Sequence, residues 1–98
     1  MRVLIQYRRG QVPGEHAAAN ERALWEWVAR LRSRPEHEQT LALSGGRTVS
    51  SAGTGDYTGD VFGISVLRVP HLDAAIDLLA DWPELPYGGR ADILTELP

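Results

Sequence analysis

The sequence contains no cysteine and no lysine, and all ten of its basic residues are arginine. Without cysteine, the chain cannot form a disulfide, use a thiol nucleophile or bind a metal through thiolates. Without lysine, it cannot form a Schiff base or carry the lysine of a phosphate-binding loop. These two absences exclude several classes of enzyme before any motif is considered.

Long hydrophobic runs are also missing. No apolar segment approaches the roughly 20 residues that span a bilayer. The N-terminal apolar run is only Val3–Ile5, whereas a secretory signal needs about 7–15 apolar residues. We therefore expect a cytoplasmic protein without a membrane partner. The formal net charge is -3 and glutamates lie between the arginines. A nucleic-acid partner is not expected, because such partners normally require a basic domain.

The remaining composition is that of a globular protein. The chain has 98 residues, of which 43% are hydrophobic and 23% charged, so we expect a single domain over residues 1–98. Val3, Ile5 and Tyr7 alternate with Arg2, Leu4 and Gln6, which predicts a strand with one buried face. Further strands are predicted at 40–44, 47–50, 61–68 and 91–97, and the glycine-rich stretch 51–59 is predicted to be a loop.

Two helices are predicted between these strands. In residues 15–33, an apolar stripe about 100° wide indicates a face that packs on the core. Residues 71–81 show the i, i+3, i+4, i+7 pattern, with His71 at the N-cap and Asp73 in the first turn, where the helix dipole favours an anion. The two stripes consist of Ala17, Leu24, Trp27, Val28 and Leu31, and of Leu72, Ala75, Ile76 and Leu79.

This order of elements predicts an α+β fold, the ferredoxin-like split βαβ sandwich, with an antiparallel sheet and two helices on one face. The other face then lacks a cover. Leu4, Leu43, Leu94 and either Phe62 or Ile64 cannot all point into the helix layer. A second copy of the sheet would cover them, so we expect a homodimer.

The C-terminal half resembles the YCII-related family, in particular its branch with an Asp-Gly-Pro-Phe motif. The resemblance lies in the glycine-led apolar strand 59–66 and the helix opening His71-Leu72-Asp73-Ala74-Ala75, then in Trp82-Pro83, Gly88-Gly89 and Asp92. It implies a protomer of a dimeric α+β barrel. The chain departs from the family at Asp56-Tyr57-Thr58, where only the aspartate of the motif remains, at Leu94, where an arginine is expected, and at Trp25, near the place of a family histidine.

Candidate site residues gather around the 51–60 loop. Asp56, Tyr57 and Asp60 offer polar groups on a loop above a rigid sheet, a common place for functional groups. The stretch 53–59 does not match a dinucleotide-binding fingerprint, since the last spacing is one residue too long and a strand follows it. The alternative to a loop that lines a ligand cleft is that the 51–60 segment is a flexible loop without a binding role. His16 is the best acid–base candidate, whereas His37 is expected in solvent.

We therefore expect a cleft between the sheet, the first helix and the 51–60 loop. His16 and Asp56 would be its catalytic residues, and Asp56, Tyr57, Asp60, Arg90 and Trp25 would bind the ligand. Arg90 would receive an anionic group, and Trp25 would be a pocket wall or a dimer anchor. No metal or cofactor is predicted. The first hypothesis is a small-molecule-binding or enzymatic protein; the alternative is a non-catalytic interaction module, and a cofactor-free monooxygenase is a distant third.

Overall fold

The computed structural model describes residues 1–98 as six strands and two α-helices. The first half contains β1 (Arg2–Arg8), α1 (Ala17–Arg32), β2 (His37–Ala42), β3 (Arg47–Ser50) and β4 (Gly53–Asp56). The second half contains β5 (Val61–Arg68), α2 (Leu72–Leu79) and β6 (Arg90–Thr95). Two short 3₁₀ helices, η1 (Gly14–His16) and η2 (Leu85–Tyr87), precede α1 and β6. No helix is long and apolar enough to cross a membrane.

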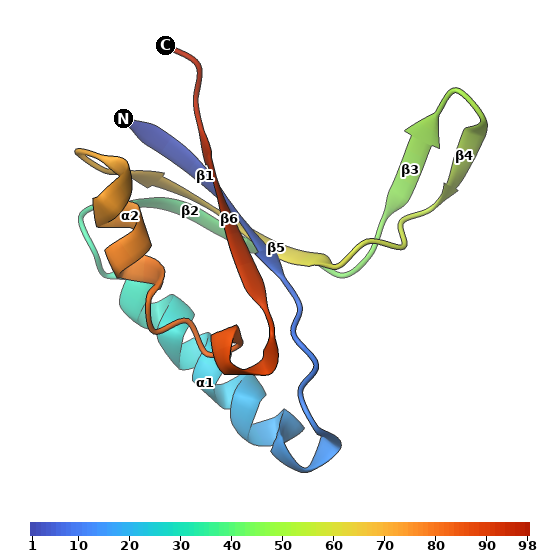
Figure 1. Cartoon of the computed structure of the whole chain (residues 1–98), viewed down its shortest axis with the longest axis horizontal. Coiled ribbons are helices and arrows are strands. Elements are labelled where there is room, and N and C mark those ends of the chain that lie inside the picture. The colour runs from blue at the N-terminus through green and yellow to red at the C-terminus, as the bar shows by residue number, and fades with distance from the viewer.

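The main sheet has the strand order β2-β5-β1-β6, and every neighbouring pair is antiparallel. Both α-helices lie on the same face of this sheet (Figure 1). This arrangement is the predicted ferredoxin-like α+β fold, which is confirmed. The strands β1 and β5 occupy the centre, because each β-α-β connection passes over one strand. The connection through α1 leaves β5 between β1 and β2, and the connection through α2 leaves β1 between β5 and β6.

The core lies between the sheet and the helices. Val3, Ile5 and Tyr7 of β1 are buried there against Trp27 and Leu31 of α1. On α2, Ala75 and Leu79 are buried, which confirms the prediction for Leu79, whereas Leu72 and Ile76 are exposed. The apolar pattern of α2 is therefore wider than the face it buries. His71 caps α2 as predicted, since its Nδ1 accepts a hydrogen bond from the N–H of Ala74 at 3.2 Å.

A β-bulge decides which face Phe62 occupies. Tyr7 pairs with Gly63 but Arg8 pairs with Val61, so Phe62 is the extra residue on β5. Its ring packs toward the core, with its centroid 6.0 Å from the nearest ring of Trp82. Ile64 lies on the opposite face, where it pairs with Gln6 of β1 and Leu41 of β2. Of the two alternatives left by the sequence, Ile64 is the residue on the uncovered face.

That uncovered face, which we call the open face, has an apolar centre between two groups of ion pairs. At one end, Arg2 contacts Glu96 at 2.8 Å and Glu38 contacts Arg68 at 3.2 Å. At the other end, Arg8 contacts both Asp60 and Asp92 at 2.6 Å, and Arg90 contacts Asp92 at 3.1 Å. The apolar centre consists of Leu4, Leu41, Ile64, Val66 and Leu94.

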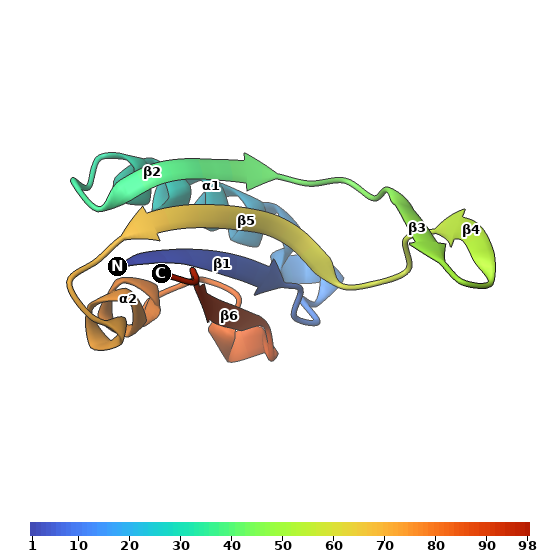
Figure 2. The same cartoon turned by 90° about the horizontal axis from the view of Figure 1, so that it is seen from above.

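The predicted loop at 51–59 is wrong, because β3 and β4 form a two-stranded hairpin that extends away from the main sheet (Figure 2). The hairpin follows from its glycines. Gly45, Gly46 and Gly53 have positive φ angles, which allow the chain to turn where other residues would be strained. Every residue of both strands is exposed. The hairpin therefore does not form a wall of the core.

Candidate functional site

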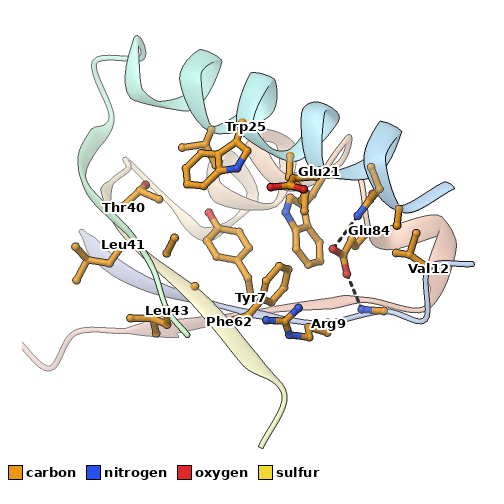
Figure 3. A pocket seen from close by; sticks show the side chains of 18 of the residues that line it. Tyr7, Arg9, Val12, Glu21, Trp25, Thr40, Leu41, Leu43, Phe62 and Glu84 are labelled. Atoms are coloured by element: carbon orange, nitrogen blue, oxygen red, sulfur yellow. Dashed lines mark hydrogen bonds between the residues drawn. The ribbon is translucent and has the colours of Figure 1, made fainter. Parts of the chain in front are cut away.

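A cavity of about 530 Å³ lies between α1 and the main sheet (Figure 3). It is the part of the helix–sheet interface that core side chains leave unfilled, and it occurs on the side of α1 that faces β2 and the β1–α1 connection. This volume falls in the range of small-molecule sites. Its apolar lining consists of Val12, Ala17, Leu24, Trp25, Val28, Ala42, Leu43, Phe62 and Trp82, together with the ring of Tyr7. Leu41 also borders the cavity from β2, although its side chain lies on the open face, opposite Ile64.

Aromatic rings form much of the wall. The Tyr7 ring lies 5.9 Å from Trp27 in an edge-to-face arrangement and 5.3 Å from Trp82. Phe62 extends this cluster through Trp82. Trp25 projects from α1 over the other side of the cavity and is 52% exposed. Fixed rings of this kind give a flat apolar ligand large contact areas.

The hydroxyl of Tyr7 reaches a second buried hydroxyl. Its Oη lies 2.8 Å from Oγ of Ser65, which is fully buried. Burial raises the pKa of Tyr7 to about 12, although the hydrogen bond with Ser65 opposes this shift. The phenol therefore carries its proton at neutral pH. Tyr7 lines the cavity, so this wall offers a polar atom as well as a ring.

A buried carboxylate lines the cavity near the start of α1. Glu84 is 4% exposed, and its oxygens accept hydrogen bonds from the N–H of Gly10 at 2.8 Å and from the amide of Asn20 at 3.1 Å. No arginine or histidine forms an ion pair with it. Two hydrogen bonds occupy only part of the accepting capacity of a carboxylate, so Glu84 can accept a further hydrogen bond from a molecule in the cavity.

A guanidinium group without a carboxylate partner also lines the cavity. The Arg9 side chain lies over the ring of Phe62, with its central carbon 4.7 Å from the ring centroid. This cation–π contact holds the group at the cavity mouth without neutralising it. The cavity thus combines an aromatic body with two carboxylates that form no ion pair, Glu84 and Glu21, and two guanidinium groups that form none, Arg9 and Arg32.

Of the residues predicted from the sequence, Trp25 lines this cavity and five do not. Asp56 is exposed on the hairpin, where it pairs with Arg47 at 2.8 Å. His16 is exposed at the end of η1, 3.7 Å from Glu15. The Tyr57 hydroxyl accepts from the N–H of Val61 at 3.1 Å, and Asp60 and Arg90 belong to the ion pairs of the open face.

The structure therefore does not bring the predicted catalytic and binding residues together in one protomer. The cleft has two of its three expected walls, the sheet and the first helix, but the third is formed by the β1–α1 connection and the segment before η2 instead of the 51–60 loop. Roles for His16 and Asp56 in catalysis, and for Asp56, Tyr57, Asp60 and Arg90 in binding, stay predictions. The structure contains no cluster of three or more His, Cys, Asp or Glu residues suited to a metal ion.

Sequence reasoning missed Glu84, Arg9, Tyr7 and Phe62 as cavity residues. For Phe62 the sequence does hold a signal, because it is the one aromatic residue in the otherwise aliphatic strand 61–68 and could lie on either face of the sheet. Glu84 offered none, because its position after Trp82-Pro83 reads as a polar connection. Its burial depends on a close approach of the β1–α1 connection to the segment around η2, since a Cβ atom added at Gly10 would lie 2.7 Å from the Tyr87 carbonyl oxygen.

No family model matches the chain, and no curated protein matches its sequence. Solved structures do match its fold. One is the 5-chloro-2-hydroxyhydroquinone dehydrochlorinase TftG from Burkholderia phenoliruptrix AC1100, in complex with 2,5-dihydroxybenzoquinone. It has a TM-score of 0.55 and 19% identity over 99% of this chain and 94% of that one. Another is an antibiotic biosynthesis monooxygenase, with a TM-score of 0.46 and 14% identity over the full length of both chains. The first of these matches shows that the two chains share the α+β fold.

Proposed function

We propose that this protein binds a small molecule with a flat apolar body in the cavity between α1 and the main sheet. The observation that carries the proposal is the cavity itself: about 530 Å³ lined by Tyr7, Trp25, Phe62 and Trp82, with carboxylate and guanidinium groups that form no ion pair. An apolar cavity with a few convergent polar groups is the usual form of a ligand site. Its role is that of a small-molecule-binding or enzymatic protein.

The polar groups narrow the ligand class. Glu84 can accept a hydrogen bond from a hydroxyl group, and Arg9 can donate to an anionic or carbonyl oxygen. A hydroxylated aromatic compound or a hydroxyquinone presents both kinds of oxygen on a flat ring. The 2,5-dihydroxybenzoquinone bound by the TftG enzyme belongs to this class and is the first compound to test here.

The proposal includes a homodimer formed through the open face and membership of the YCII-related family. The open face carries the arginines Arg2, Arg8, Arg68 and Arg90 and as many carboxylates. Equal numbers of both signs around an apolar centre suit a two-fold interface, in which the same surface must complement itself. Such an interface leaves the α1 cavity on the outside of the sheet pair, accessible to ligand.

Isothermal titration calorimetry with 2,5-dihydroxybenzoquinone tests the ligand site. We expect saturable binding to wild type, weakened at least about tenfold by Trp25→Ala, a loss of about 1.4 kcal/mol. Val49→Ala is the matched control, because Val49 is 80% exposed on the hairpin and lies outside the cavity. Equal weakening by both substitutions, or no binding of this and related hydroxyaromatic compounds, would contradict the proposal.

The hairpin favours a second candidate function, the interaction module. An isolated two-stranded hairpin is marginally stable in water, and here both strands are exposed throughout. A protein partner that covers the hairpin would supply the missing packing. Deleting residues 47–56 and joining Gly46 to Tyr57 would then remove partner binding while leaving ligand binding in the cavity intact.

A further inference from the structure

Four polar side chains form a continuous hydrogen-bonded chain from the cavity to the outer strand of the sheet. The Tyr7 hydroxyl lies 2.8 Å from Oγ of Ser65, and Ser65 Oγ lies 2.7 Å from Oγ1 of Thr40. The Thr40 hydroxyl lies 2.8 Å from Nε2 of His37. Tyr7 and Thr40 line the cavity, and in Figure 3 the Tyr7 hydroxyl is directed toward Trp25. His37 is half-buried, which corrects the expectation that it lies in solvent.

The local sequence explains how the chain of hydroxyls is built. Tyr7 lies directly opposite Gly63 in the pairing of β1 with β5, so its ring lies beside a residue that has no side chain. Ser65, two residues along on the same face, then meets the Tyr7 hydroxyl. A register shift between His37 and Gln39 places Glu38 on the open face and leaves His37 on the same side as Thr40.

The arrangement is unusual for a core position. Ser65 has no exposed surface, yet it is surrounded by the apolar core and has hydroxyl partners on both sides. An alanine would fill the position without any polar group to satisfy. Every buried polar side-chain atom of the protein has a partner, so the network is complete and has no broken link between its ends.

We propose that Tyr7, Ser65, Thr40 and His37 form a relay that moves a proton between a molecule in the cavity and the solvent at His37. The inference rests on the proposed ligand site, because the relay begins at the cavity wall. It assigns the ligand a further property: a hydroxyl group that can lose a proton to the Tyr7 oxygen.

The transfer is balanced without any co-reactant. The ligand O–H bond breaks and a new O–H bond forms at Tyr7, while the proton of Tyr7 passes to Ser65. In the same way, the Ser65 proton passes to Thr40 and the Thr40 proton to Nε2 of His37. The ligand becomes an oxyanion and His37 an imidazolium, which then releases its proton to water. Each hydroxyl both gives and receives one proton and ends unchanged.

The protonation of His37 sets the direction of the chain. With Nε2 unprotonated, the hydroxyls donate outward and the Tyr7 oxygen is free to accept from the cavity. With Nε2 protonated, they donate inward and the Tyr7 O–H can point at the ligand. Burial, together with the charge of Arg32 on α1, lowers the pKa of His37. Of the other nearby charges, Glu36 pairs with Arg34, and Glu38 pairs with Arg68 on the opposite face. The lowered pKa keeps His37 neutral above pH 6.5, so that its Nε2 has a lone pair for the Thr40 hydroxyl.

The experiment is an NMR titration of the three histidines in the full-length protein without ligand, with His37→Gln used for assignment. Tyr7 has no hydrogen bond with His37, so an effect of Tyr7 on the pKa of His37 would pass through the hydroxyls of Ser65 and Thr40. When His37 is protonated, the hydroxyls donate toward the cavity and the Tyr7 oxygen is the last acceptor. Tyr7→Phe removes this acceptor and should therefore lower the pKa of His37. The expected shift is about 0.1–0.3 pH unit, since each hydrogen bond strengthens the next by ~10–30%. Tyr57→Phe, which removes an exposed hydroxyl, should not change it.

A double-mutant cycle distinguishes coupling through the hydroxyls from a general structural effect of Tyr7→Phe on the pKa of His37. In a Ser65→Ala background the chain is already broken, so adding Tyr7→Phe should have no further effect on His37. A His37 pKa that is unchanged or raised in Tyr7→Phe, or an equal shift in the presence and absence of Ser65, would overturn the relay.

A second arm uses 4-nitrophenol, whose phenolate absorbs visible light. We expect the bound fraction to be more ionised in wild type than in Ser65→Ala, and equal ionisation in both would overturn the proposal. If 4-nitrophenol does not bind to wild type, the ligand site loses support, whereas the cycle on the ligand-free protein still decides whether the four side chains are coupled.

Discussion

Replacing Glu84 separates its contribution to stability from its contribution to ligand binding. In the folded protein its two oxygens hold the N–H of Gly10 and the amide of Asn20, and so join the β1–α1 connection and α1 to the segment before η2. Glu84→Ala removes both acceptors. The Asn20 amide can turn to water, but the N–H of Gly10 loses its partner in a partly buried position.

The magnitude follows from these contacts. An unpaired buried N–H costs about 1–3 kcal/mol. Removing the charge recovers part of the free energy that was lost when the carboxylate left water. We therefore expect Glu84→Ala to lower the free energy of unfolding by about 1–3 kcal/mol and the melting temperature by ~4–8 °C per kcal/mol for a domain of this size.

Glu84→Gln behaves differently, because Asn20 can turn its amide over. The oxygen of Asn20 then accepts from the introduced amide, whose own oxygen still accepts from Gly10. Both partners stay satisfied and only the charge assistance is lost, a cost of less than about 1 kcal/mol. Ligand binding changes more. A neutral amide is a weaker acceptor for a hydroxyl, so affinity for 2,5-dihydroxybenzoquinone should fall about tenfold or more.

Urea denaturation followed by circular dichroism measures stability, and calorimetry measures affinity. The expected pattern is a large stability loss with alanine, a small one with glutamine and an affinity loss with both. Full stability in Glu84→Ala would refute the structural part of the reasoning. Full affinity in Glu84→Gln would refute the assignment of Glu84 to the ligand.

Four further predictions test other parts of the molecule. Leu79→Ala should lower the free energy of unfolding by about 2–5 kcal/mol through lost burial and a new cavity; a urea midpoint near wild type would contradict this. Light scattering at micromolar concentration should give the mass of a dimer, whose interface we expect to bury at least about 1,000 Å². A mass near 10.8 kDa, that of one chain, would disprove the dimer. Asp56→Asn should change stability by less than about 1 kcal/mol, because its pair with Arg47 is exposed; if calorimetry shows weaker ligand binding, Asp56 returns to the site. The hydrogen bond from Arg8 holds the pKa of Asp92 below its ordinary 3.8, so the stabilising effect is present above that pH and is lost as the pH falls through the lowered pKa. Asp92→Asn should therefore lower the melting temperature near pH 7, and its effect should shrink as the pH falls below 3.8.

The fold could be predicted because its signals are local. Alternation in β1 and the apolar stripe of α1 each follow from the geometry of one element, and together with their order they define the topology. The position of Phe62 could not be predicted, because one extra residue in β5 reverses the face on which it lies. The strand at 47–50 was predicted and is β3, but its partner β4 was missed. That strand consists of glycine and small polar residues, so it lacks the apolar alternation by which strands are recognised.

The candidate site was harder to predict than the fold because it depends on contacts between distant segments. Asp56 and His16 are polar residues near glycine or a helix start, and these local features say nothing about which side of the sheet they reach. Glu84 is 74 residues from Gly10, the N–H group that it binds. Its burial can be recognised only once β1, α1 and the final connection are in place.

The two faces of the sheet differ in how they satisfy their polar groups, and this difference indicates which face is suited to a ligand. On the open face, arginines and carboxylates pair with each other around an apolar centre, so a second copy can cover them without leaving a charge unpaired. On the helix face, Glu84 and Arg9 have no ionic partner, and the Tyr7 hydroxyl belongs to a chain that ends at a titratable group. Free capacity to bind is thus concentrated on the side that dimerisation would leave accessible. This distribution is the expected one if the open face serves assembly and the α1 cavity serves a ligand.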